Sequence, residues 1–406
     1  MLSFKYVARD PATGQKVKAE VQAESEQAAS KLIRKEGLAP ISIEAAGGGE
    51  SPLGKILHKI RTKDKVLFSR QLSTLINAGL PLVQSLRNVA GQTTNKRFQV
   101  VINKLITDVE AGSSLSESMR RYPEAFDEVF VSLVAAGEVS GTLDRSLDRI
   151  ANQQEKDAEI MAKVRGAMVY PAVVLLVMGG VVGFMVVKVL PQVEVIYQGL
   201  DGVSLPLVTR VLLAVSHFIT RFWYIVIIMF VVGFFGGTRW IRTLGGRRII
   251  DRAKMRAWPI GGLFMKMYMA RFTRTGATLI GSGVPLLQML EIVSKAVNNV
   301  HIEDSLKKAI EKVKGGKALS DSIDGDSNFL DLVPNMLRIG EQSGAIEQMM
   351  GKTADYYERE VDNEVKAIST IIEPVLMIVL GVVALTIVAA ILMPIYGLVG
   401  KSGFGG

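Results

Sequence analysis

The chain has 406 residues, with 48 basic and 39 acidic side chains and a formal net charge of +9, and it is long enough for two or three domains. It has no cysteine, which excludes disulfides, thiolate metal sites and a cysteine nucleophile, and its three histidines lie too far apart to predict a metal site. The hydrophobic fraction of 49% and the mean hydropathy of +0.28 indicate that part of the chain lies in lipid.

The first 45 residues have a pattern of their own. Two short alternating runs flank the turn Asp10–Gly14, and a helix that begins at Ser25 and ends near Gly37 is followed by a third alternating run. This order predicts a small β-β-α-β module over 1–45. The glycine-rich stretch that comes next predicts a flexible linker over 46–63.

Three long uncharged runs follow, over 166–187, 222–238 and 374–400. A membrane-spanning helix needs about 20 apolar residues, which the first and third runs exceed, while the second is at the short end of the tolerated range. Trp223 and Trp240 bracket the second run, as expected of interfacial anchors. We therefore predict three membrane spans.

The distribution of Lys and Arg predicts the orientation of these spans. Seven bases and a single acid lie between Arg239 and Arg256, whereas the 190–220 region and the tail are poor in bases. The positive-inside rule puts 1–165 and 239–370 in the cytoplasm, and the 190–220 loop and the C-terminus outside. A nucleic-acid site is a second interpretation of the basic stretch, but a topology signal in contact with anionic lipid is simpler.

The chain contains an internal duplication. Seven of fourteen positions are identical between Phe68–Pro81 and Phe272–Pro285, at an offset of 204. The offset then slips to 203, at which Gly137–Gly141 matches Gly340–Gly344. Two prolines near the ends of each copy follow the same rule. Since two copies in one orientation need an even number of crossings between their starts, the duplication supports the short second span.

Each copy has the pattern of a bundle of about six short helices that leads into a span. Gly79 with Pro81 predicts a helix end followed by a helix start, and Ser114–Glu117 has the spacing of a capping box. Gly276 stands where the first copy has Leu72, and we expect it to loosen the first helix of the second copy. The candidate structural residues are Gly79, Pro81, Gly283, Pro285, Pro171, Pro374, Pro191 and Pro394.

The fold class predicted is therefore a mainly α membrane protein with two tandem cytoplasmic helical bundles and three transmembrane helices. The predicted segments are the module over 1–45, the linker over 46–63, a first cytoplasmic helical domain over 64–165, transmembrane helix 1 over 166–190, an external loop over 191–218, transmembrane helix 2 over 219–238, a basic cytoplasmic connector over 239–268, a second cytoplasmic helical domain over 269–366, transmembrane helix 3 over 367–396 and an external tail over 397–406.

Three features of the sequence are candidate sites. Gly49–Lys55 matches the start of a P-loop, but Ile56 stands where Ser or Thr should bind magnesium, so a linker is the better interpretation. The two Gly-Glu-x-Ser-Gly elements are either helix–turn–helix corners or partner contacts. Glu373 lies at the start of the third span, where a carboxylate is costly and could contact another membrane helix. The candidate partner-contact residues are Glu138, Ser140, Gly141, Glu341, Ser343, Gly344 and Glu373.

Together these segments resemble one family, the inner-membrane platform proteins of type IV pilus and type II secretion machines, known as the type II secretion F family. The resemblance covers nearly the whole chain. The segments that carry it are Phe68–Pro81 with Phe272–Pro285, the two Gly-Glu-x-Ser-Gly elements, and Glu373–Pro374 running to Pro394–Tyr396.

The resemblance implies a function. Family members couple a cytoplasmic hexameric ATPase to pilin or pseudopilin subunits in the membrane, and they carry no catalytic site, cofactor or metal. By analogy the helical domains would dock on the ATPase, the spans would face pilin helices, and the chain would form a homo-oligomer with other assembly proteins beside it. Pilus assembly is slightly favoured over secretion. A small multi-pass transporter and a membrane-anchored enzyme or nucleotide sensor are the other interpretations.

Overall fold

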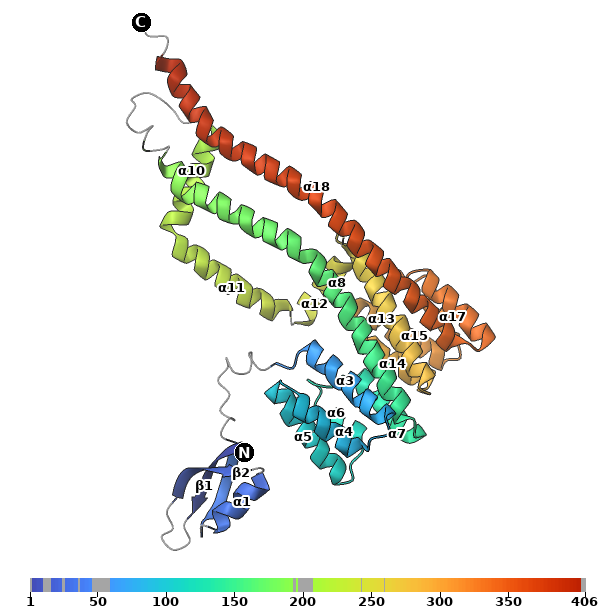
Figure 1. Ribbon diagram of the computed structural model, residues 1–406. Coiled ribbons are helices and arrows are strands. Elements are labelled where there is room, and N and C mark those ends of the chain that lie inside the picture. The colour runs from blue at the N-terminus through green and yellow to red at the C-terminus, as the bar shows by residue number, and fades with distance from the viewer. Residues whose placement is uncertain are drawn as a thin grey trace.

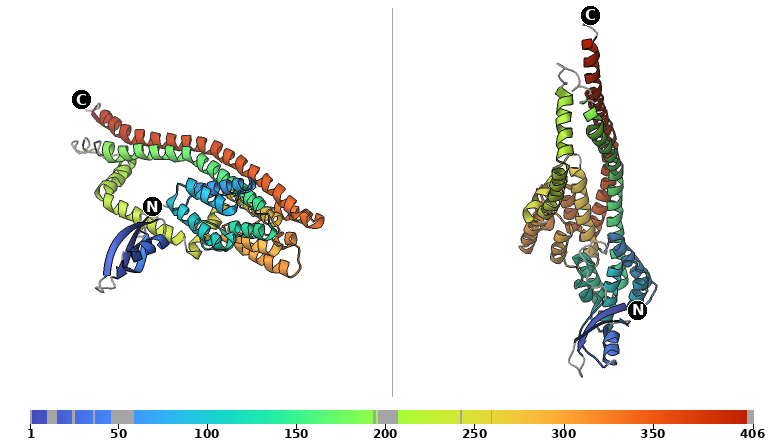
Figure 2. Two further views of the ribbon diagram at one scale, coloured as in Figure 1. Left: turned by 60° about the horizontal axis from the view of Figure 1, so that its bottom comes forward. Right: turned by 90° about the vertical axis from the view of Figure 1, so that its left-hand side faces the viewer.

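The computed structural model describes residues 2–9, 16–23, 26–35, 37–45, 59–192, 195, 207–241, 243–258 and 260–402. Most of this part of the chain is helical, in agreement with the predicted mainly α fold. Figure 1 shows two helical bundles from which two long helices, α8 and α18, extend side by side, and both views in Figure 2 show the same arrangement.

The N-terminal module contains a small antiparallel sheet in the order β2-β1-β3. Strand β1 is central, and its pairing with β3 shifts register between Val7 and Ala8. Tyr6, Ala8 and Ile33 are buried between the sheet and the helix. The elements are β1 Leu2–Arg9, β2 Lys16–Ala23, α1 Glu26–Lys35 and β3 Ala39–Ala45.

The first bundle has six helices around an aromatic core. Phe68, Phe98, Phe126 and Phe130 are almost fully buried, with ring centroids 5.1–6.4 Å apart. Such offset pairs add to the stabilisation that burial of the rings provides. The helices are α3 Thr62–Asn77, α4 Leu82–Gln92, α5 Lys96–Glu110, α6 Leu115–Arg120, α7 Glu128–Ser140 and α8 Leu143–Phe184.

The second bundle repeats this order. Its core is more aliphatic, since the positions of Phe98 and Phe130 are held by Ile302 and Val333. Among the described residues, Phe272 contacts a single phenylalanine ring, that of Phe329. The helices are α13 Gly261–Gly281, α14 Leu286–Ala296, α15 Val300–Lys314, α16 Leu319–Ile323, α17 Leu332–Ser343 and α18 Ile346–Ser402.

The expected loosening at Gly276 is not seen, because α13 is a continuous helix through this position. The space that a larger side chain would need is taken by Met350 of α18, whose methyl group a Cβ at Gly276 would strike. Met350 is 1% exposed. It stands where the first copy has Leu147, so a small residue on one helix is matched by a longer one on the other.

Among the described residues, three helices are long and apolar enough to cross a membrane. They are the helix over Leu143–Gln192, α11 over Trp223–Ile241, and α18 from Ile346 to Leu392. The first and third are continuous with the bundles, so no break separates the predicted domains over 64–165 and 269–366 from their spans. Helix α8 changes direction along its length (Figure 1), as expected of a helix with an internal proline, Pro171.

Two predictions about the spans need correction. The second span does not begin at 219, because α10, Leu207–Arg221, is a separate helix that precedes α11. Pro394, near the end of the second copy, does not end its helix either, since α18 passes Pro394 and reaches Ser402. Proline near a helix end removes only one backbone donor, which the adjoining turns tolerate.

Helix α10 joins the far ends of the first and third spans. The first span ends in a π-helical turn, η1, over Met185–Val189. Ser216 of α10 donates a hydrogen bond to the carbonyl of Val186 at 2.6 Å, and Thr209 donates to the carbonyl of Ala390 at 3.1 Å. Both hydroxyl-bearing residues are buried. They satisfy backbone groups that no water would reach in an apolar environment.

Candidate functional site at the junction of the two repeats

The Gly-Glu-x-Ser-Gly corner of the first bundle is held by its carboxylate. Glu138, near the end of α7, accepts hydrogen bonds from the backbone amides of Leu115 at 2.5 Å and Ser116 at 3.1 Å, and from the Ser116 hydroxyl at 2.5 Å. These are the first residues of α6, where amides lack a partner within the helix. Ser114 adds a cap by accepting from the Glu117 amide at 3.2 Å.

The second bundle repeats the device with one difference. Glu341 accepts from the amides of Leu319 at 2.6 Å and Ser320 at 3.3 Å, and from the Ser320 hydroxyl. The residue before α16 is Ala318, which has no side chain that could cap the helix. Glu341 therefore supplies the only side-chain cap that α16 receives from the described residues.

The backbone geometry of both corners requires glycine at two positions. Gly141 and Gly344 end α7 and α17 in the left-handed conformation, with φ of 69° and 70°. Gly137 and Gly340 let the following long helix approach closely. A Cβ on Gly340 would lie 2.9 Å from the Cα of Ile346. Both glycine pairs therefore shape the turn that starts the long helices.

The serines of the corners are also engaged within their own helices. Ser140 and Ser343 each donate a hydrogen bond, 2.7 Å long, to the carbonyl four residues earlier. The variable position points outward instead, since Val139 is 92% exposed and Gln342 is also exposed. Ser140, Gly141, Ser343 and Gly344 are exposed as well, so the last three positions of each motif lie at the surface.

In each bundle, an arginine of the first helix binds side chains near the start of the long helix, an arrangement called the arginine clamp below. In the first bundle, Arg70 donates to Asp148 at 3.0 Å, to Asn152 at 2.5 Å and, through two nitrogens, to Glu155 at 2.6 and 2.5 Å. The hydrogen bond from Arg70 holds the pKa of the Glu155 carboxyl below its usual range. About two turns of α8 are thereby tied to α3.

The second bundle has the same clamp in a more buried form. Arg274 donates to Glu358 at 2.7 Å and to Asp355, which stand at the positions of Glu155 and Asn152. The side chain of Arg274 is 22% exposed, against 35% for Arg70. The clamp was not predicted, although Arg70 and Arg274 are among the seven identities of the duplicated segment, which was the signal available.

The long helix of the first copy also connects the two bundles. Gln153 of α8 donates to the Thr275 hydroxyl and accepts from the Thr278 hydroxyl, both at 3.3 Å. Arg149 pairs with Glu347 at 3.4 Å. The side chains of this pair pass so close to Gly281 that any Cβ there would collide with them. The junction is therefore polar, and specific residues of both copies form it.

Comparison with known proteins follows the duplication closely. The family described as type II secretion system (T2SS), protein F, matches the chain twice, over 68–191 and 272–394, and its N-terminal domain matches 1–44. The two matched ranges begin 204 residues apart and end 203 apart, as the internal repeat does. The chain belongs to the type II secretion system protein F family.

The relatives of this chain have two kinds of name. The chain is similar to a type IV pilus assembly protein PilC of Thermus thermophilus, at 37% identity over 98% of both chains, and to one of Pseudomonas aeruginosa, at 35% identity over 90% of this chain and 97% of the relative. It is also similar to a type II secretion system protein F of Pseudomonas aeruginosa, at 32% identity over 98% of this chain and 99% of the relative.

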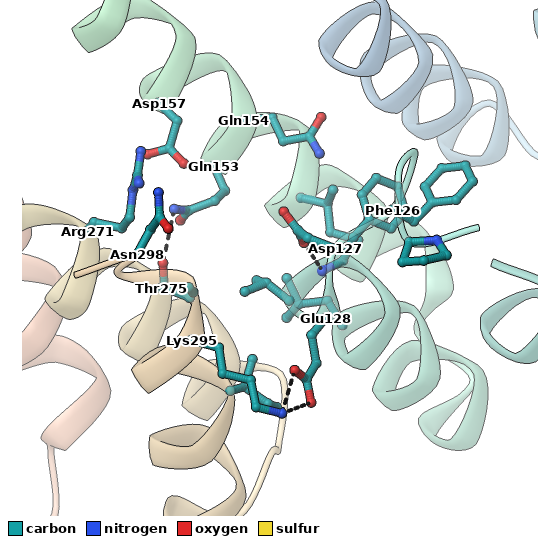
Figure 3. Close-up of a pocket in the computed structure, with 17 residues that line it drawn as sticks. Phe126, Asp127, Glu128, Gln153, Gln154, Asp157, Arg271, Thr275, Lys295 and Asn298 are labelled. Carbon is teal, nitrogen blue, oxygen red and sulfur yellow. Dashed lines mark hydrogen bonds and ion pairs between the residues drawn. The ribbon is translucent and has the colours of Figure 1, made fainter. Parts of the chain in front are cut away.

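A cavity of about 560 Å³ lies between the two bundles of this family member. Figure 3 shows the pair of Lys295 and Glu128 at one side, with Nζ–O distances of 2.9 and 3.1 Å, and Gln153 and Asp157 at the other. Arg271 and Asp157 point toward one another. Burial raises the pKa of the Asp157 carboxyl above its usual range, and the charge of Arg271 opposes that rise.

The residues that line this cavity carry charges of both signs. Within the described residues, no group of three or more His, Cys, Asp or Glu side chains is placed to hold a metal ion. The cavity wall contains three acids, two bases and three amides beside apolar side chains. The P-loop-like segment 49–55 lies outside the described residues.

Glu373 stands apart from these sites. It is on α18 and exposed, and it forms no hydrogen bond or ion pair with any residue that the structure describes. The last base before it on the same helix is Lys366, about 10 Å along the axis at 1.5 Å per residue. The first copy has Tyr170 at the matching position. Glu373 is thus a carboxylate unique to the third span.

Proposed function

We propose that this protein is an inner-membrane platform of a type IV pilus or type II secretion machine, which couples a cytoplasmic hexameric ATPase to the insertion of pilin or pseudopilin subunits into a filament. The observation that carries the proposal is that α8 and α18 each run without a break from a bundle into a membrane span. A partner that binds a bundle therefore acts on a rigid element that reaches the membrane. Such a role needs no catalytic residue.

The orientation follows the positive-inside rule. The bundles and the N-terminal module face the cytoplasm, where the ATPase is, and the C-terminus is external. The basic connector contacts anionic lipid. The protein acts as a homo-oligomer with other inner-membrane assembly proteins, and its domain limits are those predicted from the sequence, with α10 added to the external loop.

The corner residues take a defined part in this proposal. Because Glu138 and Glu341 cap helices of their own bundles, we infer that the Gly-Glu-x-Ser-Gly residues shape the fold, and that a partner contact at the corner is made by Val139 and Gln342. Glu373, with no internal partner among the described residues, is the residue proposed to meet another membrane helix.

Pilus assembly is favoured slightly over secretion. The pilus relatives named above are 37% and 35% identical to the chain, against 32% for the secretion relative, and the difference is small. The proposal therefore rests on the shared role of both kinds of relative.

The test is a clean deletion in the native organism, complemented by the wild-type chain from a plasmid. Surface filaments are imaged and secreted proteins are assayed, with ATPase and pilin levels checked as unchanged. Lost filaments with intact secretion, restored by the plasmid, identify a pilus platform. Intact filaments with exoproteins trapped in the cell identify the secretion form. Survival of both activities contradicts the proposal, and protein-dependent solute flux into liposomes would replace it with a transporter.

A further inference from the structure

Helix α12, Leu244–Arg256, connects the end of α11 to the place where α8 and α18 enter the membrane, and both lie at the same membrane boundary. It begins just after α11 ends at Ile241, with Thr243 as its cap. Beyond its other end, Ile260 packs into a cluster with Val164 of α8 and Ile368 of α18. These residues are where the charged parts of α8 and α18 give way to their spans. A helix of 13 residues is about 20 Å long, so α12 must run along the membrane surface.

One side of α12 is anchored to the second bundle, which fixes its rotation. Asp251, only 3% exposed, accepts a hydrogen bond from the amide of Val300 at 3.1 Å and so caps α15. The ring of His301 is 3.0 Å from the carbonyl oxygen of Arg248. The face of α12 opposite Asp251 is therefore held away from the bundle.

A row of three exposed arginines runs along the side of α12 between the anchored side and the opposite one. Arg248, Arg252 and Arg256 are spaced by four residues, which places them one above the other on the helix. Like charges at this spacing destabilise a helix unless an anion lies near them. Arg248 pairs with Asp304 at 3.1 Å, whereas Arg252 and Arg256 form no ion pair with any described residue.

Large apolar side chains flank this row. Leu244 is 81% exposed and Ile249 is 59% exposed, and Trp258, just beyond the helix, is 84% exposed. Exposed apolar side chains beside arginines are typical of a helix that lies in the membrane interface, where Trp is the preferred aromatic anchor. A nucleic-acid surface would require the arginines but not the leucine and isoleucine.

We infer that the exposed face of α12 is a binding site for the headgroups of anionic phospholipids, and that the cap from Asp251 to α15 attaches the second bundle to the membrane through it. This inference rests on the proposed orientation and assigns the lipid contact to one helix face. The residues that form the site are Leu244, Arg248, Ile249, Arg252, Arg256 and Trp258.

Depth in the membrane is the first test. In full-length protein in nanodiscs, Trp258 is left as the sole tryptophan by Trp223→Phe and Trp240→Phe, and its fluorescence is measured with lipids brominated near the headgroup. A matched protein retains only Trp223, at the start of α11. Quenching of both supports the inference. Quenching of Trp223 alone overturns it and leaves the membrane topology standing, whereas quenching of neither contradicts the spans on which the proposed function depends.

Charge is the second test. Arg252→Gln with Arg256→Gln is compared with Arg120→Gln with Arg145→Gln, which removes the same charge from exposed positions of the first bundle. Phosphatidylglycerol is titrated against the thermal unfolding midpoint, with phosphatidylcholine as the neutral lipid. We expect the α12 pair to weaken the apparent affinity for phosphatidylglycerol about 10- to 30-fold, since each base near an anionic surface contributes about 1 kcal/mol.

The first-bundle pair should leave this affinity unchanged. Equal weakening by both pairs would show a general charge effect and overturn the inference. Stabilisation by single-stranded RNA that exceeds that by phosphatidylglycerol, and that the α12 pair abolishes, would also overturn it and make the face a nucleic-acid site.

Discussion

The first bundle has Leu72 where the second has Gly276, and yet α3 and α13 are both continuous helices at this position. The partner helix differs in the opposite sense, with Leu147 in the first copy and Met350 in the second. Three turns show no such exchange, since glycines with positive φ occur at matching places in both copies, in the pairs Gly79 and Gly283, Gly112 and Gly316, and Gly141 and Gly344. A duplicated bundle can thus exchange core volume between helices, while these three turns keep their glycine.

The largest expected change in stability comes from a substitution that removes core volume from one helix of the first bundle. Leu72→Gly should destabilise the first bundle by about 4 kcal/mol, because it leaves a cavity and puts glycine within a helix. Adding Leu147→Met, which recreates the pair of the second copy, should recover a substantial part of that loss. The thermal unfolding midpoint of the detergent-solubilised protein measures both. A double variant no more stable than the single one would show that the two positions do not exchange volume.

The second largest effect is expected where Gly137 of α7 lies close to the start of α8. Gly137→Ala should cost about 2 kcal/mol, because its Cβ would lie 2.6 Å from the Ser146 hydroxyl and 3.1 Å from the Cα of Leu143. Gly91→Ala is the control, since this helical glycine has open space around its Cβ position. It should be neutral or slightly stabilising. Equal losses at Gly137 and Gly91 would contradict the role given to the corner.

The two capping glutamates should differ in their importance. Glu341→Gln should cost about 2 kcal/mol and Glu138→Gln about 1 kcal/mol, because Ser114 still caps α6 whereas Ala318 leaves α16 without a second cap. Ala318→Ser should narrow this difference by rescuing Glu341→Gln. The prediction fails if Ala318→Ser has no effect in that background while the two single variants lose equal stability.

The two arginine clamps allow a similar comparison. Arg274→Gln should cost about 2 kcal/mol, since its partner Glu358 is only 13% exposed, and Arg70→Gln about 1 kcal/mol, since its partners are more exposed. Limited proteolysis of α8 and α18 would report local loosening in each variant. Faster cleavage at α8 than at α18 after Arg274→Gln would contradict the assignment of the clamps.

The smallest effect concerns pH. Asp157 and Glu360 stand at matching positions, yet burial raises the pKa of Asp157, whereas the hydrogen bond from Lys266, 2.9 Å long, lowers the pKa of Glu360. A carboxyl group whose pKa is raised by folding stabilises the folded state at acidic pH. This stabilisation is lost as the pH rises through the raised pKa. A carboxyl group whose pKa is lowered by folding stabilises the folded state at neutral pH. This stabilisation is lost as the pH falls through the lowered pKa.

Asp157→Asn should therefore gain stability relative to wild type as the pH rises from 4 to 7, and Glu360→Gln should lose it over the same range. Unfolding midpoints at several pH values measure both slopes. Slopes of the same sign in the two variants would contradict the assignment.

The sequence allowed the repeat, the helical bundles and the outer two spans to be predicted, because hydrophobic runs, Gly–x–Pro breaks and identities at a fixed offset are local patterns. The compensation of Gly276 by Met350 could not be predicted, since it depends on contact between helices more than 70 positions apart. For the same reason the sequence marks the glutamates of the corner motif as candidate contacts but does not reveal the helix starts that they cap.

The continuity of α18 has a geometrical consequence. Its 57 residues extend about 85 Å at 1.5 Å per residue, and its base is clamped by Arg274 while its far part lies among the spans. A rod of this length converts a small rotation into a large translation. A change of 5° in the direction of the clamped base would move the far end by about 7 Å, more than one helical turn.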